Sequence, residues 1–190
     1  SEIIKLIPEG AELKEMESAG LSRDRIDTDK YIWNINYKNG HASFDAKTKK
    51  LRSFYIYNGN QPEADIENGG ETKKEVSEER KAKALEFINK VDPEKADLIE
   101  LEPSDGSRDG YLSFVRKVNG FKFYENNITV TFDKDDNIIG YDCYWYDSVK
   151  FPEAKNIVDS KEIFDKVKET ADFDLIYENF EKNKKSNIIL

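Results

Sequence analysis

The sequence that decides the fold is a segment that occurs twice. Residues 42–57 read ASFDAKTKKLRSFYIY, and residues 130–145 read VTFDKDDNIIGYDCYW. They align without a gap at a constant offset of 88 residues. Each is a strand that ends in Phe-Asp, a polar turn, and an aliphatic residue that opens an aromatic strand. Only the Phe and the Asp are identical, so the shared order of strand, turn and strand carries the comparison. Such a repeat indicates a fold built by duplication.

The sequence around the first copy predicts an antiparallel meander. Residues 31–37 alternate between large apolar and polar side chains, which is the period of a half-buried strand. Asn39-Gly40 predicts a type I′ hairpin turn, because both central positions of that turn need a positive φ angle. A third strand is expected at residues 51–58.

A helix and a longer meander are expected around the second copy. Ser77 is the expected N-cap of this helix, which should end before Asp92-Pro93. Its apolar stripe is expected to be Ala84, Leu85, Ile88 and Val91. The meander follows at residues 111–146, with a turn at Asn119-Gly120.

The same order of elements predicts the domain organisation. Residues 1–75 form a first unit without its leading helix, followed by a linker, and residues 76–151 form a complete helix-plus-meander unit. Residues 152–190 begin a third unit, with a helix capped by Asp159 or Ser160. The chain opens on Ser1 and shows no signal peptide, so we interpret it as an excised or mature fragment.

The composition limits the classes of partner. The chain has 190 residues and a formal net charge of −9. Nucleic acids and anionic membrane surfaces bind basic footprints, so we expect neither as a partner. No run approaches the roughly 20 apolar residues of a membrane-spanning helix, so no direct membrane insertion is expected. The single cysteine, Cys143, is expected to be a packed core thiol.

The second meander resembles a known family. From Phe114 the sequence runs FVRKVNGF, followed by NITVTFD at residues 127–133, by Ile139-Gly-Tyr, and by Trp145. This pattern resembles the YcdB/YcdC repeated domain of Gram-positive bacteria. That family is itself similar to PepSY domains and to the propeptide domains of thermolysin-type proteases. The first meander fits the same pattern in shortened form.

The resemblance implies a fold and a role. The fold would be α+β, with tandem PepSY-like units that each pack a helix on a curled antiparallel meander sheet. The protein would be exported or cell-surface associated, with a role in binding or restraining a peptidase. One departure concerns the turn after the strand-ending Asp, where the family's usual glycine is replaced by Thr48-Lys49 and by Asp136-Asn137. Asn adopts the left-handed conformation at low cost, and Lys does so less readily.

Two acidic loops are candidate cation sites. Residues 133–137 (DKDDN) match the opening of an EF-hand loop, but that loop needs Gly and Glu where this chain has Ile138 and Tyr144. A solvated hairpin turn is therefore the favoured interpretation. The loop at residues 105–110 carries three side chains with oxygen atoms that could bind a cation: Asp105, Ser107 and Asp109. We interpret this loop as a plain connection between strands.

The sequence predicts no catalytic residue, no cofactor and no metal. A zinc centre based on histidine, or a Ser-His-Asp triad, would have to use His41, the only histidine, which flanks a hairpin turn. No phosphate-binding motif of the GxxxxGK[ST] or GxGxxG type is present. Arg116 is expected to form an ion pair with a nearby acid.

Aromatic residues of the repeated hairpins form the candidate partner-binding face. Trp145 is expected to point at the covering helix, which places Tyr144 and Tyr146 on the opposite face of the sheet. The offset of 88 residues assigns Phe54 and Ile56 to that same face. The face either binds a peptide or glycan, or packs against the neighbouring unit.

These observations favour a non-catalytic interaction module, secreted or at the cell surface, whose partner is a peptidase or another extracellular protein. Free sheet edges make strand addition its natural binding mode. The alternative is a structural spacer or wall-binding module of a larger envelope protein. A third hypothesis is a small carboxylate-dependent hydrolase, which would need two acids with raised pKa in one pocket. The oligomeric state stays open.

Overall fold

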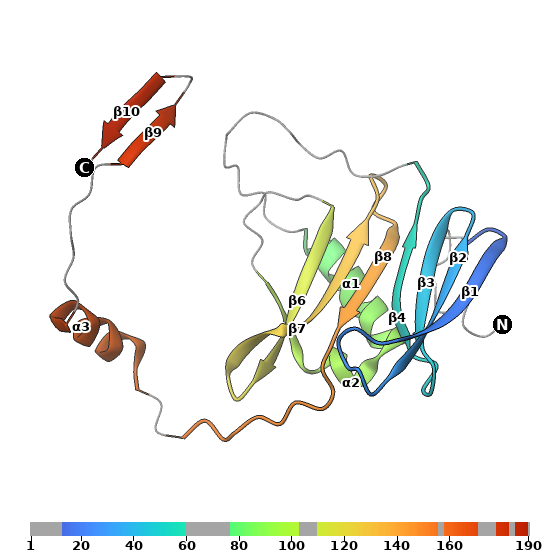
Figure 1. The fold of residues 1–190 in the computed structure, drawn as a ribbon, viewed down its shortest axis with the longest axis horizontal. Helices are drawn as coiled ribbons and strands as arrows, with labels where there is room; N and C mark the ends of the chain where they lie inside the picture. Colours follow the sequence, from blue (N-terminus) through green and yellow to red (C-terminus); the bar gives the residue numbers. More distant parts are fainter. Residues whose placement is uncertain are drawn as a thin grey trace. The chain divides into compact units, whose positions relative to one another are not determined.

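The computed structural model describes residues 13–59, 77–102, 110–155, 158–170, 178–182 and 185–189. They belong to two compact units, one within residues 1–151 and the other within residues 152–190. Figure 1 shows the elements of both units. The expected loop ligands Asp105, Ser107 and Asp109 lie outside the described residues.

The first unit contains eight strands and two helices in its described part. In chain order they are β1 (Met16–Arg23), β2 (Tyr31–Tyr37), β3 (Gly40–Asp45), β4 (Leu51–Ile56), α1 (Glu78–Val91), α2 (Pro93–Ala96), β5 (Ile99–Leu101), β6 (Tyr111–Val118), β7 (Phe121–Phe132) and β8 (Ile138–Tyr144). The second unit contains α3 (Ser160–Thr170), β9 (Glu178–Lys182) and β10 (Lys185–Ile189).

The strands of the first unit form one antiparallel sheet in the order β1-β2-β3-β4-β8-β7-β6-β5. Each half of this sheet is a meander, and the halves join where β4 pairs with β8. Phe54 lies opposite Tyr141 at the centre of that pairing. The fold is therefore α+β, as predicted, with both meanders in one continuous sheet whose edges are β1 and β5.

Helix α1 forms where the sequence supplies a cap and an apolar stripe. The Ser77 side chain accepts a hydrogen bond from Arg80 N at 3.5 Å, and two glutamates in the first turn suit the positive end of the helix. The helix ends at Val91, just before Asp92-Pro93, as predicted. Its buried residues are Ala84, Phe87, Ile88 and Val91.

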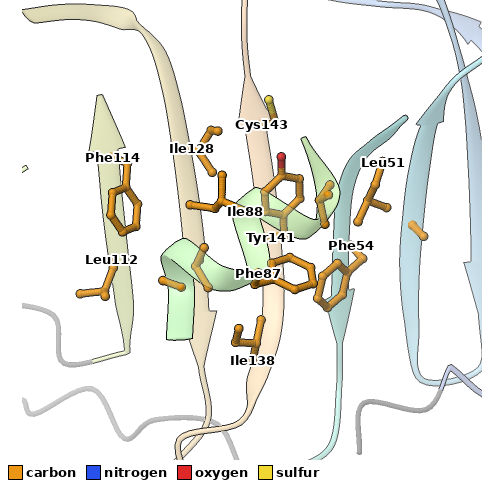
Figure 2. Close-up of a cluster of buried hydrophobic side chains, with 14 of the residues drawn as sticks. Leu51, Phe54, Phe87, Ile88, Leu112, Phe114, Ile128, Ile138, Tyr141 and Cys143 are labelled. Atoms are coloured by element: carbon orange, nitrogen blue, oxygen red, sulfur yellow. The ribbon is translucent and has the colours of Figure 1, made fainter. Parts of the chain in front are cut away.

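Phe87 of α1 connects the two halves of the sheet. Its ring centroid lies 5.9 Å from that of Phe54 on β4 and 5.6 Å from that of Tyr141 on β8, with both contacts edge-on. Figure 2 shows these three rings together on the helix-covered side of the sheet. Cys143 is buried in the same cluster, so the predicted core thiol is confirmed. One hydrophobic core thus spans both meanders.

The β3–β4 hairpin contains a β-bulge next to its turn. Ser43 lies opposite Ser53, whereas its neighbour Phe44 lies opposite Leu51. Arg52 is therefore the extra residue on β4, without a partner on β3.

The β7–β8 hairpin contains the same bulge at the equivalent place. Thr131 lies opposite Gly140, whereas its neighbour Phe132 lies opposite Ile138. Ile139 is the extra residue here, so Ile139 corresponds to Arg52.

The gap-free alignment of the two copies is wrong by one residue after the turn. Phe132 follows Phe44 by 88 positions, but Ile138 follows Leu51 by 87. The turn of the first hairpin is one residue longer. Because side chains alternate between the two faces of a strand, this slip exchanges the faces assigned to the whole of β4.

The two Asn-Gly dipeptides have different roles. Asn119 and Gly120 have φ angles of 53° and 86°, which suit the type I′ turn between β6 and β7. Asn39 and Gly40 are not among the residues with positive φ, so the type I′ turn predicted there is wrong. A Cβ added to Gly40 would lie 2.2 Å from the carbonyl oxygen of Tyr55. Glycine is needed here for the close approach of β4.

The second unit begins with a capped amphipathic helix. Lys161 N donates to the Asp159 carboxylate at 2.7 Å, so Asp159 is the cap of the two predicted candidates. The exposed apolar side chains of α3 are Ile163, Phe164 and Val167. No helix in the described residues has the length and apolar character needed to cross a membrane. That residues 152–190 begin a third repeat stays a prediction, as does the boundary at residue 75.

Candidate interaction site on the open face of the sheet

Helices α1 and α2 lie on one face of the sheet, and no helix in the described part of the first unit covers the other face, which we call the open face (Figure 1). A row of polar side chains crosses the open face. Each residue of the row lies directly opposite the next one on the neighbouring strand. The row consists of Ser43, Ser53, Asp142, Thr129 and Ser113. The Ser43 and Ser53 hydroxyl oxygens are 2.6 Å apart.

A hollow of about 490 Å³ opens beside this row, between strands β2, β3, β4 and β8 and the loop after β1. Asp24 holds that loop in place. Its carboxylate accepts from Arg52 Nη2 at 3.0 Å and from Ile26 N at 2.8 Å, and its backbone N donates to Lys30 O at 2.9 Å. The Asp24 and Arg52 side chains are almost completely buried. The bulge residue Arg52 therefore builds one wall of the hollow.

Asp142 is the acid at the centre of the polar row. Its side chain is exposed, but it stands in the hollow, where the surrounding strands displace part of its hydration shell. This burial raises the pKa of Asp142, and the charges of Arg52 and His41 offset the rise in part. Asp142 can thus accept hydrogen bonds from a ligand, or donate one when it is protonated.

Tyr144, the last residue of β8, and Tyr146 extend the site past the end of the strand. Tyr146 N donates to Asn126 Oδ1 at 2.9 Å, and Asn126 Nδ2 donates to Tyr146 O at 3.2 Å. The fully buried Asn126 side chain thus acts like a strand partner. The two tyrosine hydroxyls are 3.3 Å apart, and this hydrogen bond, with some burial, raises the pKa of Tyr146. Tyr144 lines the hollow, whereas Trp145 is buried in the core.

Phe54 and Ile56 do not lie on this face. They are 1% and 2% exposed and belong to the hydrophobic core. Figure 2 shows Phe54 beside Phe87 of α1. The prediction that they share a face with Tyr144 and Tyr146 is wrong, and the reason is the one-residue difference between the turns. Counted through the bulges, Phe54 corresponds to Tyr141. That the two tyrosines bind a partner stays a prediction.

An aromatic cluster occupies the other end of the open face. The ring of Tyr55 stacks on His41 at 6.3 Å between centroids and lies 5.3 Å from the ring of Tyr57. A Cβ added to Gly140 would lie 2.8 Å from Cδ2 of Tyr55, so the tyrosine ring covers the glycine opposite it. His41 is therefore an aromatic neighbour on this face. The sequence interpretation did not identify this cluster.

Asp45 and Asp133 anchor the turns of the two repeated hairpins. Asp133 Oδ1 accepts from the backbone N of Asp135 and of Asn137, both at 2.9 Å. Asp45 Oδ1 accepts from Thr48 N at 2.6 Å and from Lys47 N at 3.0 Å. Both carboxylates are thereby used by their own turns. In the described part of the chain, no three His, Cys, Asp or Glu residues gather as potential metal ligands.

Arg116 contacts aromatic rings. Its guanidinium carbon lies 5.2 Å from the Trp145 ring centroid and 4.7 Å from that of Phe151. No carboxylate among the described residues forms an ion pair with Arg116, so the predicted ion pair is wrong within that part of the chain. The side chain stands on the helix-covered face in line with Phe114, where two rings occupy the space beside it.

The open face suits binding through hydrogen bonds and aromatic contacts. The acids that line the hollow are Asp24 and Asp142, and Asp24 is committed to Arg52. Hydrolysis by two carboxylates would therefore have to recruit an ion-paired acid. Two signals in the sequence could have pointed to the hollow: Arg52 interrupts an apolar strand opening, and Asp142 interrupts an aromatic strand.

Comparison with known proteins identifies the family. The family model described as the YcdB, YcdC repeated domain matches residues 3–145, which include both meanders and both repeated hairpins. No curated protein and no solved structure matches the chain. Since the match covers well over half of the chain, this protein belongs to the family of the YcdB, YcdC repeated domain.

Proposed function

We propose that this chain is a non-catalytic interaction module of an exported or cell-surface protein, and that it binds an extended segment of its partner as an added strand on β1. The observation that carries the proposal is the free edge of β1. All eight residues of Met16–Arg23 are exposed, and no strand in the described part of the chain pairs with their outer side. Such an edge presents unpaired backbone groups to a partner strand.

The two edges of the sheet differ in their capacity to bind. β5 at the far edge has three residues, which is too short for a long ladder. β1 is longer and contains no proline, and its bulge lies at one end, near Met16. Leu21 lies opposite Trp33, and both side chains are exposed beside the edge. An added strand could therefore bury apolar side chains here as well as pair its backbone.

The hollow on the open face gives the edge a possible source of specificity. Ser22 and Arg23 at the end of β1 also line the hollow, so an added strand would pass beside it. Alternate side chains of the partner would point to this face. Arginine side chains at the rim and Asp142 inside would favour a partner segment of mixed charge.

The class of partner comes from the resemblance to PepSY and propeptide domains. We propose an extracellular peptidase, bound in a PepSY-like manner by units that repeat in tandem. The match to a repeated-domain family supports the tandem arrangement. The bound segment would restrain the peptidase by occupying a strand of the sheet.

Two neighbouring proline substitutions on β1 test the binding mode. In an antiparallel pair, alternate residues direct their N–H groups toward the partner strand and away from it. Ala19→Pro and Gly20→Pro each remove one backbone N–H group. In one variant this group donates a hydrogen bond to β2, and in the other it points outward, toward the added strand. A side chain at position 20 meets no atom within 4 Å. The variant that keeps the melting temperature of the wild type should lose peptide binding.

The binding partner for this test comes from arrays of peptides that cover the peptidases co-secreted by the host. Captured sequences are then synthesised and measured by calorimetry against the wild type and both proline variants. Specific binding that disappears in the stable proline variant supports the proposal. Binding that survives in both variants, or no binding to any of these peptidases, contradicts it.

The aromatic cluster on the open face favours one alternative, a wall-binding module. His41, Tyr55 and Tyr57 form a stacking surface of the kind that sugar rings use. Tyr57 is 57% exposed. In that case purified cell-wall glycan should sediment with the wild type and not with Tyr55→Ala/Tyr57→Ala. A structural spacer would bind neither the peptidase peptides nor the cell-wall glycan.

A further inference from the structure

A second hollow lies at the end of the sheet near α2. It has a volume of about 320 Å³ and is formed by the turn after β3, by α2, by β6 and by the residues that follow β8. Figure 1 shows the β3–β4 turn, α2 and the end of β8 at this same end of the sheet. Five cationic side chains and three acidic ones line it, in a chain whose net charge is −9. The cations are Lys30, Lys50, Arg52, Lys95 and Arg116.

Four of these five cations already have carboxylate partners. Lys50 Nζ lies 2.9 Å from Asp92 Oδ1, and Lys95 Nζ lies 2.5 Å from the other oxygen of the same carboxylate. Lys30 pairs with Asp147. Arg52 pairs with Asp24, as described above. Lys50 Nζ also lies 2.8 Å from Glu94 Oε2, so four carboxylates balance these four cations locally.

Arg116 is the exception. Its described contacts are with the Trp145 and Phe151 rings, and its Nε is buried without a hydrogen-bond partner. Guanidinium has five N–H donors in a planar fork, and ring faces satisfy none of them as an oxygen would. Leaving a buried donor without an acceptor is unfavourable. Among the described residues, Arg116 is thus a cation that two rings hold in place and that no carboxylate pairs with.

We propose that this hollow is a binding site for a carboxylate attached to an apolar group, with Arg116 as the residue that binds it. A planar carboxylate matches the guanidinium fork with two parallel hydrogen bonds. Trp145 and Leu98, which also line the hollow, provide apolar contact for the rest of the ligand. The carboxylate can come from the C-terminus of a peptide or from an Asp or Glu side chain.

The charges around Arg116 favour a carboxylate over a phosphate. Asp45, Glu94 and Asp147 line the same hollow, and they would repel a phosphate dianion more strongly than a carboxylate, which carries a single negative charge. A single negative charge balances the one unpaired cation. This hollow shares Arg52 with the hollow on the open face. The residue proposed to bind the ligand is Arg116, which does not line the open-face hollow, so the inference does not depend on the function proposed for β1 and the open face.

Tryptophan fluorescence gives a direct readout. The chain has two tryptophans, so Trp33→Phe leaves Trp145 in the site as the only reporter. Three matched probes are titrated: acetyl-Leu-Gln-Leu, with a terminal carboxylate; acetyl-Leu-Glu-Leu-amide, with a side-chain carboxylate; and acetyl-Leu-Gln-Leu-amide, with neither. Calorimetry repeats each titration, so that binding without a fluorescence change is detected.

We expect one or both of the carboxylate probes to bind and the uncharged amide not to bind. The probe that binds identifies the source of the carboxylate. Arg116→Lys keeps the charge and loses the planar fork, and should weaken binding by about tenfold or more. Lys117→Gln changes an exposed neighbouring cation and should leave the affinity unchanged. Far-UV circular dichroism checks that both variants are folded.

Three results would overturn the proposal. The first is equal binding of the uncharged amide. The second is unchanged affinity in a folded Arg116→Lys variant. The third is the absence of both heat and fluorescence change with either carboxylate probe. Tighter binding of inorganic phosphate than of both carboxylate probes would also contradict the ligand class.

Discussion

The hairpins β3–β4 and β7–β8 have the same backbone plan but use their bulges differently. In both, the turn begins at an aspartate whose carboxylate accepts hydrogen bonds from the turn, and the strand after the turn contains one extra residue. In β3–β4 the extra residue is Arg52, which binds Asp24 and builds a wall of the hollow. In β7–β8 it is Ile139, which is 1% exposed and lies outside the main core cluster. The two copies share their backbone and differ in the side chains that shape the surface.

The lengths of the two turns explain why the sequence comparison failed at this point. Lys49 has a φ angle of 63° and Asp136 one of 60°, so these are the equivalent left-handed positions. They are 87 residues apart, whereas the aspartates that begin the turns, Asp45 and Asp133, are 88 apart. One extra residue in the first turn is enough to change which side of β4 faces the core.

Truncation of Phe54 should have the largest effect among the tests of the equivalence between Phe54 and Tyr141. Phe54→Ala should lower the free energy of unfolding by about 3–5 kcal/mol, because it leaves a cavity beside Phe87 and Tyr141. Tyr57→Ala, at an exposed aromatic position, should cost less than about 1 kcal/mol. Chemical denaturation measures both. Equal, small losses would mean that Phe54 faces solvent, as the gap-free alignment assigns it.

Several parts of this architecture could be predicted from the sequence. The strands of both meanders, the start and end of α1 and the burial of Cys143 follow from alternation, capping residues and helical spacing. The pairing of β4 with β8 could not, because no local pattern specifies which edges of two meanders meet. The bulges were missed for a related reason: Arg52 marks an irregular position without showing that it is an extra residue, and Ile139 is an ordinary strand residue type. The positions of the aromatic cluster and of the hollow depend on the pairing of β4 with β8 and on the bulges.

The next largest effect distinguishes the two bulges. Arg52→Ile gives the first hairpin the residue of the second, and it should destabilise the protein by about 3 kcal/mol because it leaves Asp24 buried and unpaired. The double variant Asp24→Leu/Arg52→Ile removes both charges and should recover most of the loss. Thermal and chemical denaturation of all three proteins measure the difference. A stable single variant would show that the bulge residues are interchangeable.

A smaller effect is expected at the two turn aspartates. Burial on its own raises the pKa of each, but the hydrogen bonds from the turn outweigh it, so the pKa of Asp45 and of Asp133 lies below the usual value. A lowered folded-state pKa stabilises the protein above the unfolded-state pKa, and this contribution is lost as the pH falls from the unfolded-state value of about 4 through the lower folded-state pKa. Asp45→Asn and Asp133→Asn should each cost about 1–2 kcal/mol at neutral pH.

Stability measured between about pH 5 and pH 3 gives the sharper test of the aspartates. The wild type should lose stability over this range, and each Asn variant should lose less. The two variants should behave alike, because the turns are equivalent. A change in the pH dependence for one variant and not for the other would break the comparison between the hairpins.

The smallest effect concerns the left-handed positions. Lys49→Gly should raise the free energy of unfolding by about 0.5–1 kcal/mol, because glycine adopts a positive φ angle without strain. Asp136→Gly should give less or nothing, since it also removes the ion pair between Asp136 and Arg80. Calorimetric melting temperatures compare the two variants. Destabilisation by Lys49→Gly would contradict the assignment of that turn.

The most direct test of the single continuous sheet is a nuclear Overhauser experiment on the isotope-labelled protein. The structure predicts backbone contacts between β4 and β8, with cross-strand signals that place Phe54 opposite Tyr141 and Ser53 opposite Asp142. This one register accounts for the shared core, for the burial of Phe54 and for the position of the hollow on the open face. Absence of any signal between β4 and β8, or a register in which Phe54 lies opposite Asp142, would contradict it.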